Sequence, residues 1–295
     1  MSDLTHLYIG LPMWSHDSWQ TGIYGDGCPT SERLRRYGKI FNTVEGNTTF
    51  YAIPSPAIVR RWANTVPDSF KYTFKLPQTI THRDKLRHCA AELTSFLNVM
   101  EPLFAATGQW MIQLPPSFSA ESLPVLETFL NQIPQALTVA VEVRHPMFYS
   151  KGGEELRLNQ MLHQYHANRV MFDSRALFST IPASAVVADA QQKKPKLPVH
   201  VVATAQQPLI RFIGTADLQA NQRFFHPWLI QLTTWIEQGI TPYVMVHTPD
   251  NALAPQLAIM IYQWLNSYWL GSHDFSLRPQ PSLLPILEDP QLGFF

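Results

Sequence analysis

Short apolar runs that end in polar residues recur along this chain of 295 residues and alternate with stretches of helical character. We predict eight strands, over residues 7–10, 43–46, 71–75, 110–114, 138–143, 169–173, 209–213 and 243–247. Helices are predicted between them, over residues 30–40, 55–65, 86–106, 120–132, 153–167, 221–238 and 253–269. Alternating strands and helices form parallel sheets, so the pattern predicts an α/β fold, a single (β/α)8 TIM-type barrel, with an open doubly wound sheet as the alternative.

The domain organisation follows from where this alternation holds. We predict one barrel domain over residues 1–270 and a Pro-rich C-terminal appendage, packed on the barrel, over residues 271–295. The crossover 176–208 contains the basic, Pro-punctuated run QQKKPKLP and is predicted to be irregular. The phosphate-binding signatures G-x-G-x-x-G and G-x-x-x-x-G-K-[ST] do not occur, so we expect no nucleotide cofactor of those folds and predict no cofactor.

Composition excludes several classes of partner. The net charge is +0, from 22 basic and 22 acidic residues, which argues against a broad surface for double-stranded nucleic acid. Two cysteines, Cys28 and Cys89, are too few for a disulfide framework or a four-sulfur zinc site, so we expect no metal. The N-terminus has no signal-peptide character and no apolar run is long enough to span a bilayer, so we expect a cytoplasmic protein without membrane contact. The sequence carries no signal for an oligomeric state.

The order of residues within strands indicates which side chains point into the barrel. In TVAVEVR, residues 138–144, the valines 139, 141 and 143 lie on one face, while Glu142 and Arg144 lie on the other. The valine face packs under helices, so we expect the other face to point inward. The same parity at other strand ends predicts a polar inward ring of Glu45, Asn47, Lys75, Gln113, Glu142, Arg144, Asp173, Arg211 and His247.

This ring would lie at the carboxyl ends of the strands, where α/β barrels build their active sites. The candidate catalytic residues are Glu45, Glu142, His82, His145 and Asp173. The candidate substrate-binding residues are Asn47, Tyr51, Lys75, Gln113, Arg144, Arg211, His247 and Trp14.

Several blocks of sequence, in order, carry a family resemblance. From about Ile9 to Ala258 they are Gly10, Trp14, Trp19 and Tyr24, then VEGNTTFY (44–51), FK (74–75), TH (81–82), QLPPSF (113–118), VEVRHP (141–146), FDS (172–174), RFIG (211–214) and HTPDN (247–251). On these blocks the chain resembles domain-of-unknown-function family 72, the YecE-like proteins. The resemblance implies a TIM-type barrel and no established activity. The chain departs from the family at Gly46, where an aliphatic residue is usual, and in the HTPDN turn, where the family favours asparagines.

Several chemical readings of the ring stay open. Glu45 and Glu142 would suit a glycosidase pair. Carboxylates and an imidazole, from Glu45, Glu142, Asp173 and His247, would suit a divalent metal, although neighbouring cations would repel it. The same charges would also suit a structural network of ion pairs that closes the barrel mouth.

The cations Lys75, Arg144 and Arg211 favour a further reading, in which they hold an anionic ligand. We therefore predict an enzyme that acts on a small anionic substrate by acid–base or hydrolytic chemistry, with Glu45 and Glu142 as acid and base and His82 or His145 relaying protons. The alternative is a non-catalytic binding protein for an anionic metabolite or a single-stranded nucleic acid end, since aromatic side chains beside cations suit such ligands. A scaffold with an inactive barrel is a third possibility.

Overall fold

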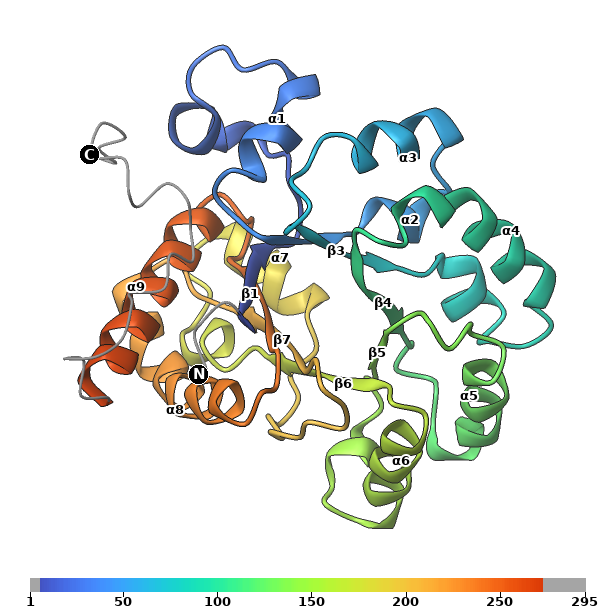
Figure 1. Ribbon diagram of the computed structural model, residues 1–295. Coiled ribbons are helices and arrows are strands. Elements are labelled where there is room, and N and C mark those ends of the chain that lie inside the picture. Colours follow the sequence, from blue (N-terminus) through green and yellow to red (C-terminus); the bar gives the residue numbers. More distant parts are fainter. Residues whose placement is uncertain (1–5, 273–295) are drawn as a thin grey trace. The chain divides into compact units, whose positions relative to one another are not determined.

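The computed structural model describes residues 6–272 of the chain (Figure 1). Its strands are β1 (Tyr8–Leu11), β2 (Thr43–Gly46), β3 (Lys71–Lys75), β4 (Thr107–Gln113), β5 (Val139–Glu142), β6 (Asn168–Asp173), β7 (Leu209–Ile213) and β8 (Tyr243–His247). The eight strands neighbour one another in chain order in a closed barrel. The pairs β1–β2, β1–β8, β3–β4, β4–β5 and β5–β6 are parallel. The predicted (β/α)8 fold is therefore confirmed. The predicted appendage lies outside the described residues, apart from the end of the last helix.

The helices between the strands are α1 (Thr30–Tyr37), α2 (Thr48–Tyr51), α3 (Pro56–Ala63), α4 (Ala90–Met100), α5 (Leu123–Leu130), α6 (Gly153–Gln164), α7 (Ala185–Lys193), α8 (Gln222–Glu237) and α9 (Ala254–Ser272). No helix within residues 6–272 is long and apolar enough to cross a bilayer. The chain divides into two compact units. The first unit comprises the chain up to Val44, Asp173–Lys196 and the chain from Ile210 onward, and the second comprises Glu45–Phe172 and Leu197–Leu209.

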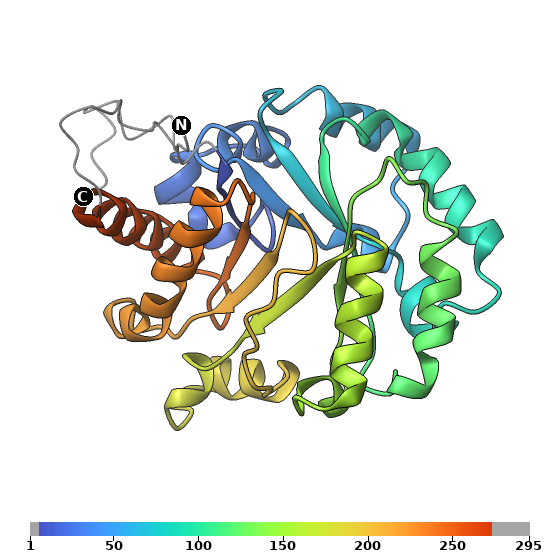
Figure 2. The same cartoon turned by 60° about the horizontal axis from the view of Figure 1, so that its bottom comes forward.

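Aromatic packing outside β3 and β4 builds the core of the second unit. Phe74 of β3 stacks on Trp62 of α3 with 5.7 Å between ring centroids, and on Tyr72 with 4.9 Å. Trp110 of β4 meets Phe96 of α4 edge to face. Figures 1 and 2 show α4, α5 and α6 following one another along the outside of strands β3 to β6. The outward parity predicted for Tyr72 and Phe74 is thus confirmed, and Lys75 is left to point the other way.

Two contacts tie the strands and loops of the first unit. Tyr8 of β1 and Tyr243 of β8, which are register partners, stack with 4.4 Å between ring centroids. The indole nitrogen of Trp19 donates a hydrogen bond of 3.0 Å to the carbonyl oxygen of Asn251. Helices α8 and α9 pack together, and Figure 2 shows them next to each other in orange and red.

The crossover predicted to be irregular contains a helix, α7, so that prediction was wrong in part. Ser184 starts the helix, because its hydroxyl accepts a hydrogen bond from the amide of Val187, 3.3 Å away. The alanine-rich run that follows has high helix propensity, and the helix ends at Lys193, two residues before Pro195. The prolines of the run QQKKPKLP, at 195 and 198, favour an irregular segment, but they act only after the helix has ended.

Gly46 leaves room for an aromatic ring. A Cβ atom built on Gly46 would lie 2.3 Å from the Phe74 ring. This separation is shorter than any van der Waals contact, so the ring occupies the volume that a side chain would need.

We expect Gly46→Ala to lower the free energy of unfolding by about 1–3 kcal/mol, because overpacking forces side chains off their rotamers. Adding Phe74→Leu, which removes the ring, should recover part of the loss. Chemical denaturation of the three variants measures this. An unchanged denaturation midpoint for Gly46→Ala would contradict the packing argument.

A buried ion pair holds the segment before β7 in the second unit. Glu155 of α6 accepts hydrogen bonds from Arg169 Nη1 at 2.9 Å, from His200 Nδ1 at 2.6 Å and from the backbone amide of Lys151 at 2.8 Å. Burial alone would raise the pKa of Glu155, but these three donors outweigh it and lower the pKa. Both Glu155 and Arg169 are almost fully buried, so each depends on the other for its neutralisation.

We expect Glu155→Gln to destabilise the protein by about 3–5 kcal/mol, since it leaves the Arg169 charge buried without its partner. Because the pKa of Glu155 is lowered on folding, its stabilising contribution is complete above the ordinary carboxyl pKa of 4.5 and is lost as the pH falls below it. Urea unfolding across this pH window measures both effects. The control is Glu154→Gln on the same helix, which forms no ion pair within residues 6–272.

Candidate functional site

The second unit carries nine of the predicted site residues, on or just after the carboxyl ends of β2 to β5. They are Glu45, Asn47, Tyr51, Lys75, His82, Gln113, Glu142, Arg144 and His145. The first unit carries the other four, which are Trp14, Asp173, Arg211 and His247. The convergence of both groups on one cleft stays a prediction.

Lys75 links three neighbouring strands of the second unit. Its ammonium group donates to Gln113 Oε1 at 2.8 Å and lies 3.3 Å from Glu45 Oε1. It also lies 5.7 Å from the centroid of the Phe50 ring. Glu45 is fully buried and Lys75 is 7% exposed, so the pair is held in a medium of low polarity, where its attraction is strong. Lys75 and Gln113, which were both predicted on inward positions, are thus in contact with each other.

Glu142 and Arg144 form a second ion pair at the end of β5. Arg144 Nε donates to Glu142 Oε1 at 2.7 Å, and Glu142 is fully buried. Arg144 makes no other hydrogen bond with any residue of the described chain. Its two terminal amino groups therefore remain available, and together they form the fork that binds carboxylate or phosphate oxygens in a bidentate manner.

His82 lies on a single turn of π-helix, η4 (Thr79–Arg83), that follows β3. Its Nδ1 atom lies 2.9 Å from the hydroxyl of Thr81, and that hydroxyl lies 3.2 Å from the carbonyl oxygen of Pro77. The hydroxyl has one proton for these two acceptors, so the contacts alone do not assign the tautomer of His82. The Nε2 atom of His82 hydrogen-bonds to no residue between 6 and 272.

The surroundings of His82 keep its imidazole neutral. Burial lowers its pKa from the ordinary value of 6.5, and the positive charges of Arg144 and Lys75 lower it further. The carboxylate of Glu142 acts in the opposite direction but does not outweigh them. Residues of both ion pairs thus act on the charge of His82. The ring of His82 packs edge-on against Phe50, with 5.0 Å between centroids.

The backbone after this turn is strained. Lys85, Leu86 and His88 adopt positive φ angles of 46°, 66° and 52°, in the left-handed region that such residues rarely occupy. Backbone strain of this kind persists only where the surroundings impose it, and it is common at functional sites.

His145 differs from His82 in the hydrogen bond that its ring nitrogen makes. Its Nδ1 atom accepts a hydrogen bond of 3.2 Å from the backbone amide of Met147 and so caps a short helical turn. Its lone pair is thereby engaged, which leaves Nε2–H as a donor. Tyr51 is 72% exposed and meets Phe50 edge to face, while Asn47 stands at the start of α2.

In the first unit, the carboxylate of Asp173 accepts hydrogen bonds from residues that were not among the predicted site residues. Its carboxylate accepts from Arg175 Nε at 2.9 Å and Nη2 at 2.7 Å, and from Trp228 Nε1 at 2.8 Å. Arg175 follows Asp173 at the same spacing that separates Arg144 from Glu142, so this repeat of the carboxylate-x-Arg pattern was a usable signal. Trp228 is distant from Asp173 in the sequence, and no motif around it indicated this hydrogen bond.

The other predicted residues of the first unit differ in burial. Arg211 and His247 are 2% and 1% exposed. Trp14 is half-buried, and its carbonyl oxygen accepts a hydrogen bond from the hydroxyl of Tyr24. Within residues 6–272, no cluster of three or more His, Cys, Asp or Glu side chains has the arrangement of a metal site.

Comparison with known proteins decides the family. The profile of the family described as "Protein of unknown function DUF72" matches residues 8–281. The chain belongs to this family. It is 48% identical over 258 residues to the "UPF0759 protein YecE" of Escherichia coli K12, an alignment that covers 87% of this chain and 92% of the relative. The same-named protein of Escherichia coli O157:H7 is 47% identical over the same length.

Two crystal structures of family members share the fold. The DUF72 protein of Enterococcus faecalis V583 superposes with a TM-score of 0.66 at 18% identity, covering 93% of this chain and 99% of that one. The DUF72 protein of Thermotoga maritima superposes with a TM-score of 0.63 at 20% identity, covering 88% and 98%. At such identities the likeness concerns the fold alone. It agrees with the barrel described above.

The effect of the Arg144 charge on the pKa of His82 leads to a titration prediction. We expect the pKa of His82 to lie below 6.5 and to rise in Arg144→Ala, because that substitution removes a nearby positive charge and leaves Glu142 to favour the imidazolium. NMR titration of the histidine ring protons measures both values. Arg87→Ala is the control, since Arg87 is an exposed cation on the same connection and should leave the titration of His82 unchanged. A His82 pKa at or above 6.5 would contradict the arrangement.

Proposed function

We propose that this protein is an enzyme that acts on a small anionic substrate by acid–base chemistry, with His82 as the general base. The observation that carries the proposal is an imidazole whose pKa is lowered by burial and by Arg144, and whose Nε2 atom hydrogen-bonds to no residue within 6–272, together with the two open amino groups of Arg144. A base whose pKa lies somewhat below neutrality is unprotonated at neutral pH, as a general base must be.

The roles follow from the contacts. The terminal amino groups of Arg144 would bind a carboxylate or phosphate of the substrate, and Lys75 would add a second positive charge at the edge of the site. His82 Nε2 would remove a proton from the substrate, or from a water molecule that attacks it. Glu142 would stabilise the imidazolium as it forms, because its charge already favours that state.

The two ion pairs leave the cluster without a net charge. Glu45 neutralises Lys75, and Glu142 neutralises Arg144. The affinity for an anion would then come from directed hydrogen bonds, so the geometry of the Arg144 fork matters more than the sum of the charges. This consideration favours planar anions such as carboxylates, or phosphate oxygens presented in pairs.

We expect a small anion to raise the melting temperature of the wild-type protein, since a ligand that binds only the folded state stabilises it. The panel comprises inorganic phosphate, sulfate and small mono- and dicarboxylates. Arg144→Lys should lose most of the protection, because an ammonium group lacks the planar fork. Arg87→Ala is the matched control and should keep it. Arg211→Lys in the same assay tests the sequence-based expectation that Arg211 also binds the anion.

Turnover of any protecting compound is then measured. His82→Asn should reduce the rate roughly 10²–10⁴-fold while the anion still protects. The control is His163→Asn, a change to an exposed histidine on α6. If none of the anions protects the wild type, or if Arg144→Lys is protected equally, the charges serve internal ion pairs and the proposal fails.

A binding protein without catalysis is the second candidate, and Tyr51 favours it. A tyrosine that is 72% exposed beside Phe50 offers a flat surface on which a ring of an anionic metabolite or a nucleic acid end would stack. Protection that depends on Tyr51 as well as Arg144, with no turnover of the bound compound, would establish this alternative.

A further inference from the structure

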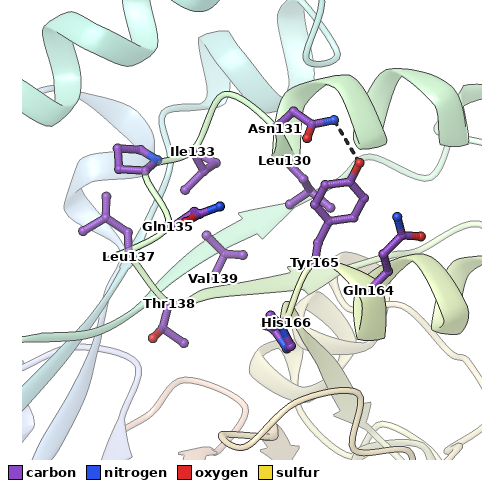
Figure 3. Close-up of a pocket in the computed structure, with 11 residues that line it drawn as sticks. Leu130, Asn131, Ile133, Gln135, Leu137, Thr138, Val139, Gln164, Tyr165 and His166 are labelled. Atoms are coloured by element: carbon purple, nitrogen blue, oxygen red, sulfur yellow. Dashed lines mark hydrogen bonds between the residues drawn. The ribbon is translucent and has the colours of Figure 1, made fainter.

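An open pocket of about 640 Å³ lies at the amino-terminal end of β5, at the opposite end of that strand from Glu142 (Figure 3). Its walls come from the end of α5, from the connection that leads into β5 and from the end of α6. A strand rises about 3.3 Å per residue, so roughly 10 Å of β5 separates the pocket from the site described above. The volume falls within the range of small-molecule sites.

The charge of this pocket differs from that of the Arg144 site. None of the described residues that line it is Asp, Glu, Lys or Arg. Helices α5 and α6 both end at its wall, and the carboxyl end of a helix carries a partial negative charge. Apart from the imidazole of His166, which also lines the pocket, an anion would find no side chain to pair with, and the field of the helix ends is unfavourable. The pocket therefore suits a neutral ligand.

Tyr165 provides a fixed aromatic surface. Its hydroxyl accepts a hydrogen bond of 2.9 Å from Asn131 Nδ2 and lies 3.4 Å from Glu127 Oε1, to which it donates. Figure 3 shows the Tyr165 ring on one side of the pocket, and Gln135 and Val139 across from it. Because the hydroxyl is tethered at both of its hydrogen-bonding positions, little ring freedom is lost when a ligand packs against its face.

Neutral hydrogen-bonding groups surround this ring. The side chains of Gln135, Gln164 and Thr138 line the pocket and hydrogen-bond to no residue within 6–272. Each amide offers two donors and one carbonyl acceptor, and the hydroxyl offers both functions. Beneath them, Leu130 and Val139 are buried and form an apolar floor.

We propose that this pocket binds a neutral saccharide. Sugar hydroxyls both donate and accept hydrogen bonds, as side-chain amides do, so the two sets of groups complement each other. The C–H face of a pyranose carries a slight positive charge and packs on the negative face of an aromatic ring such as Tyr165. The saccharide site is independent of the proposed acid–base site and of its substrate.

The test is ligand-observed NMR with a panel of glucose, galactose, mannose, N-acetylglucosamine and maltose, followed by titration of any sugar that binds. Gln164→Ala should weaken binding about 3- to 10-fold, the loss expected for one hydrogen bond. Gln164 is exposed, so this variant keeps the fold. Tyr165→Ala should abolish binding, whereas Tyr165→Phe should retain most of it because the ring remains.

The matched control is His163→Ala, which changes an exposed residue beside Gln164 that does not line the pocket, and it should bind as the wild type does. The corresponding sugar phosphates and uronic acids should bind more weakly than the neutral sugars. The proposal is overturned if no neutral sugar binds the wild type, or if the charged sugars bind better than the neutral ones. It is also overturned if Gln164→Ala and Tyr165→Ala both leave binding unchanged.

Discussion

A charge that points into the interior of a barrel must be neutralised there, and this requirement organises the second unit of the protein. Lys75 and Glu45 satisfy it across β2 and β3, and Arg144 and Glu142 satisfy it at the end of β5. Removing one partner of such a pair would leave the other buried and unpaired, at a cost of several kcal/mol. The pairs therefore fix the ends of these strands, and they place His82 in the electrostatic environment that keeps it neutral.

The pairing with Glu142 uses only part of the Arg144 guanidinium group. Only the Nε edge of the guanidinium is engaged by Glu142, so the ion pair stabilises the fold and still leaves two amino groups directed elsewhere. A lysine in the same position would lack the planar pair of amino groups that binds an oxyanion in a bidentate manner. The side chain that neutralises Glu142 can thus be the side chain that recognises an anion.

The strands and the direction of their side chains could be predicted because a parallel barrel imposes period two and continuous burial on short segments. Phe74 and Lys75 illustrate this, since one packs on α3 and the other reaches Glu45. Partners that are distant in sequence could not be predicted in this way. Trp228 reaches Asp173 through the packing of α8, and no pattern near either residue indicates that contact. The neutral state of His82 likewise depends on burial and on charges from other strands. Helix α7 was missed because prolines after it outweighed its own propensity.

The π-helical turn that carries His82 has a consequence for how this site tolerates change in length. Its amide hydrogen bond runs from Asp84 back to Thr79, one residue farther than in an α-helix. The extra residue sets the rotation of every side chain that follows. Loss of one residue from the turn would restore α-helical spacing and swing the later positions by about 100° around the axis. Deletion of one residue of the turn before His82 would thus redirect the imidazole, although the charged residues of the two ion pairs and His82 itself would all be retained. In this part of the chain, register along the sequence is as much a determinant of chemistry as residue identity.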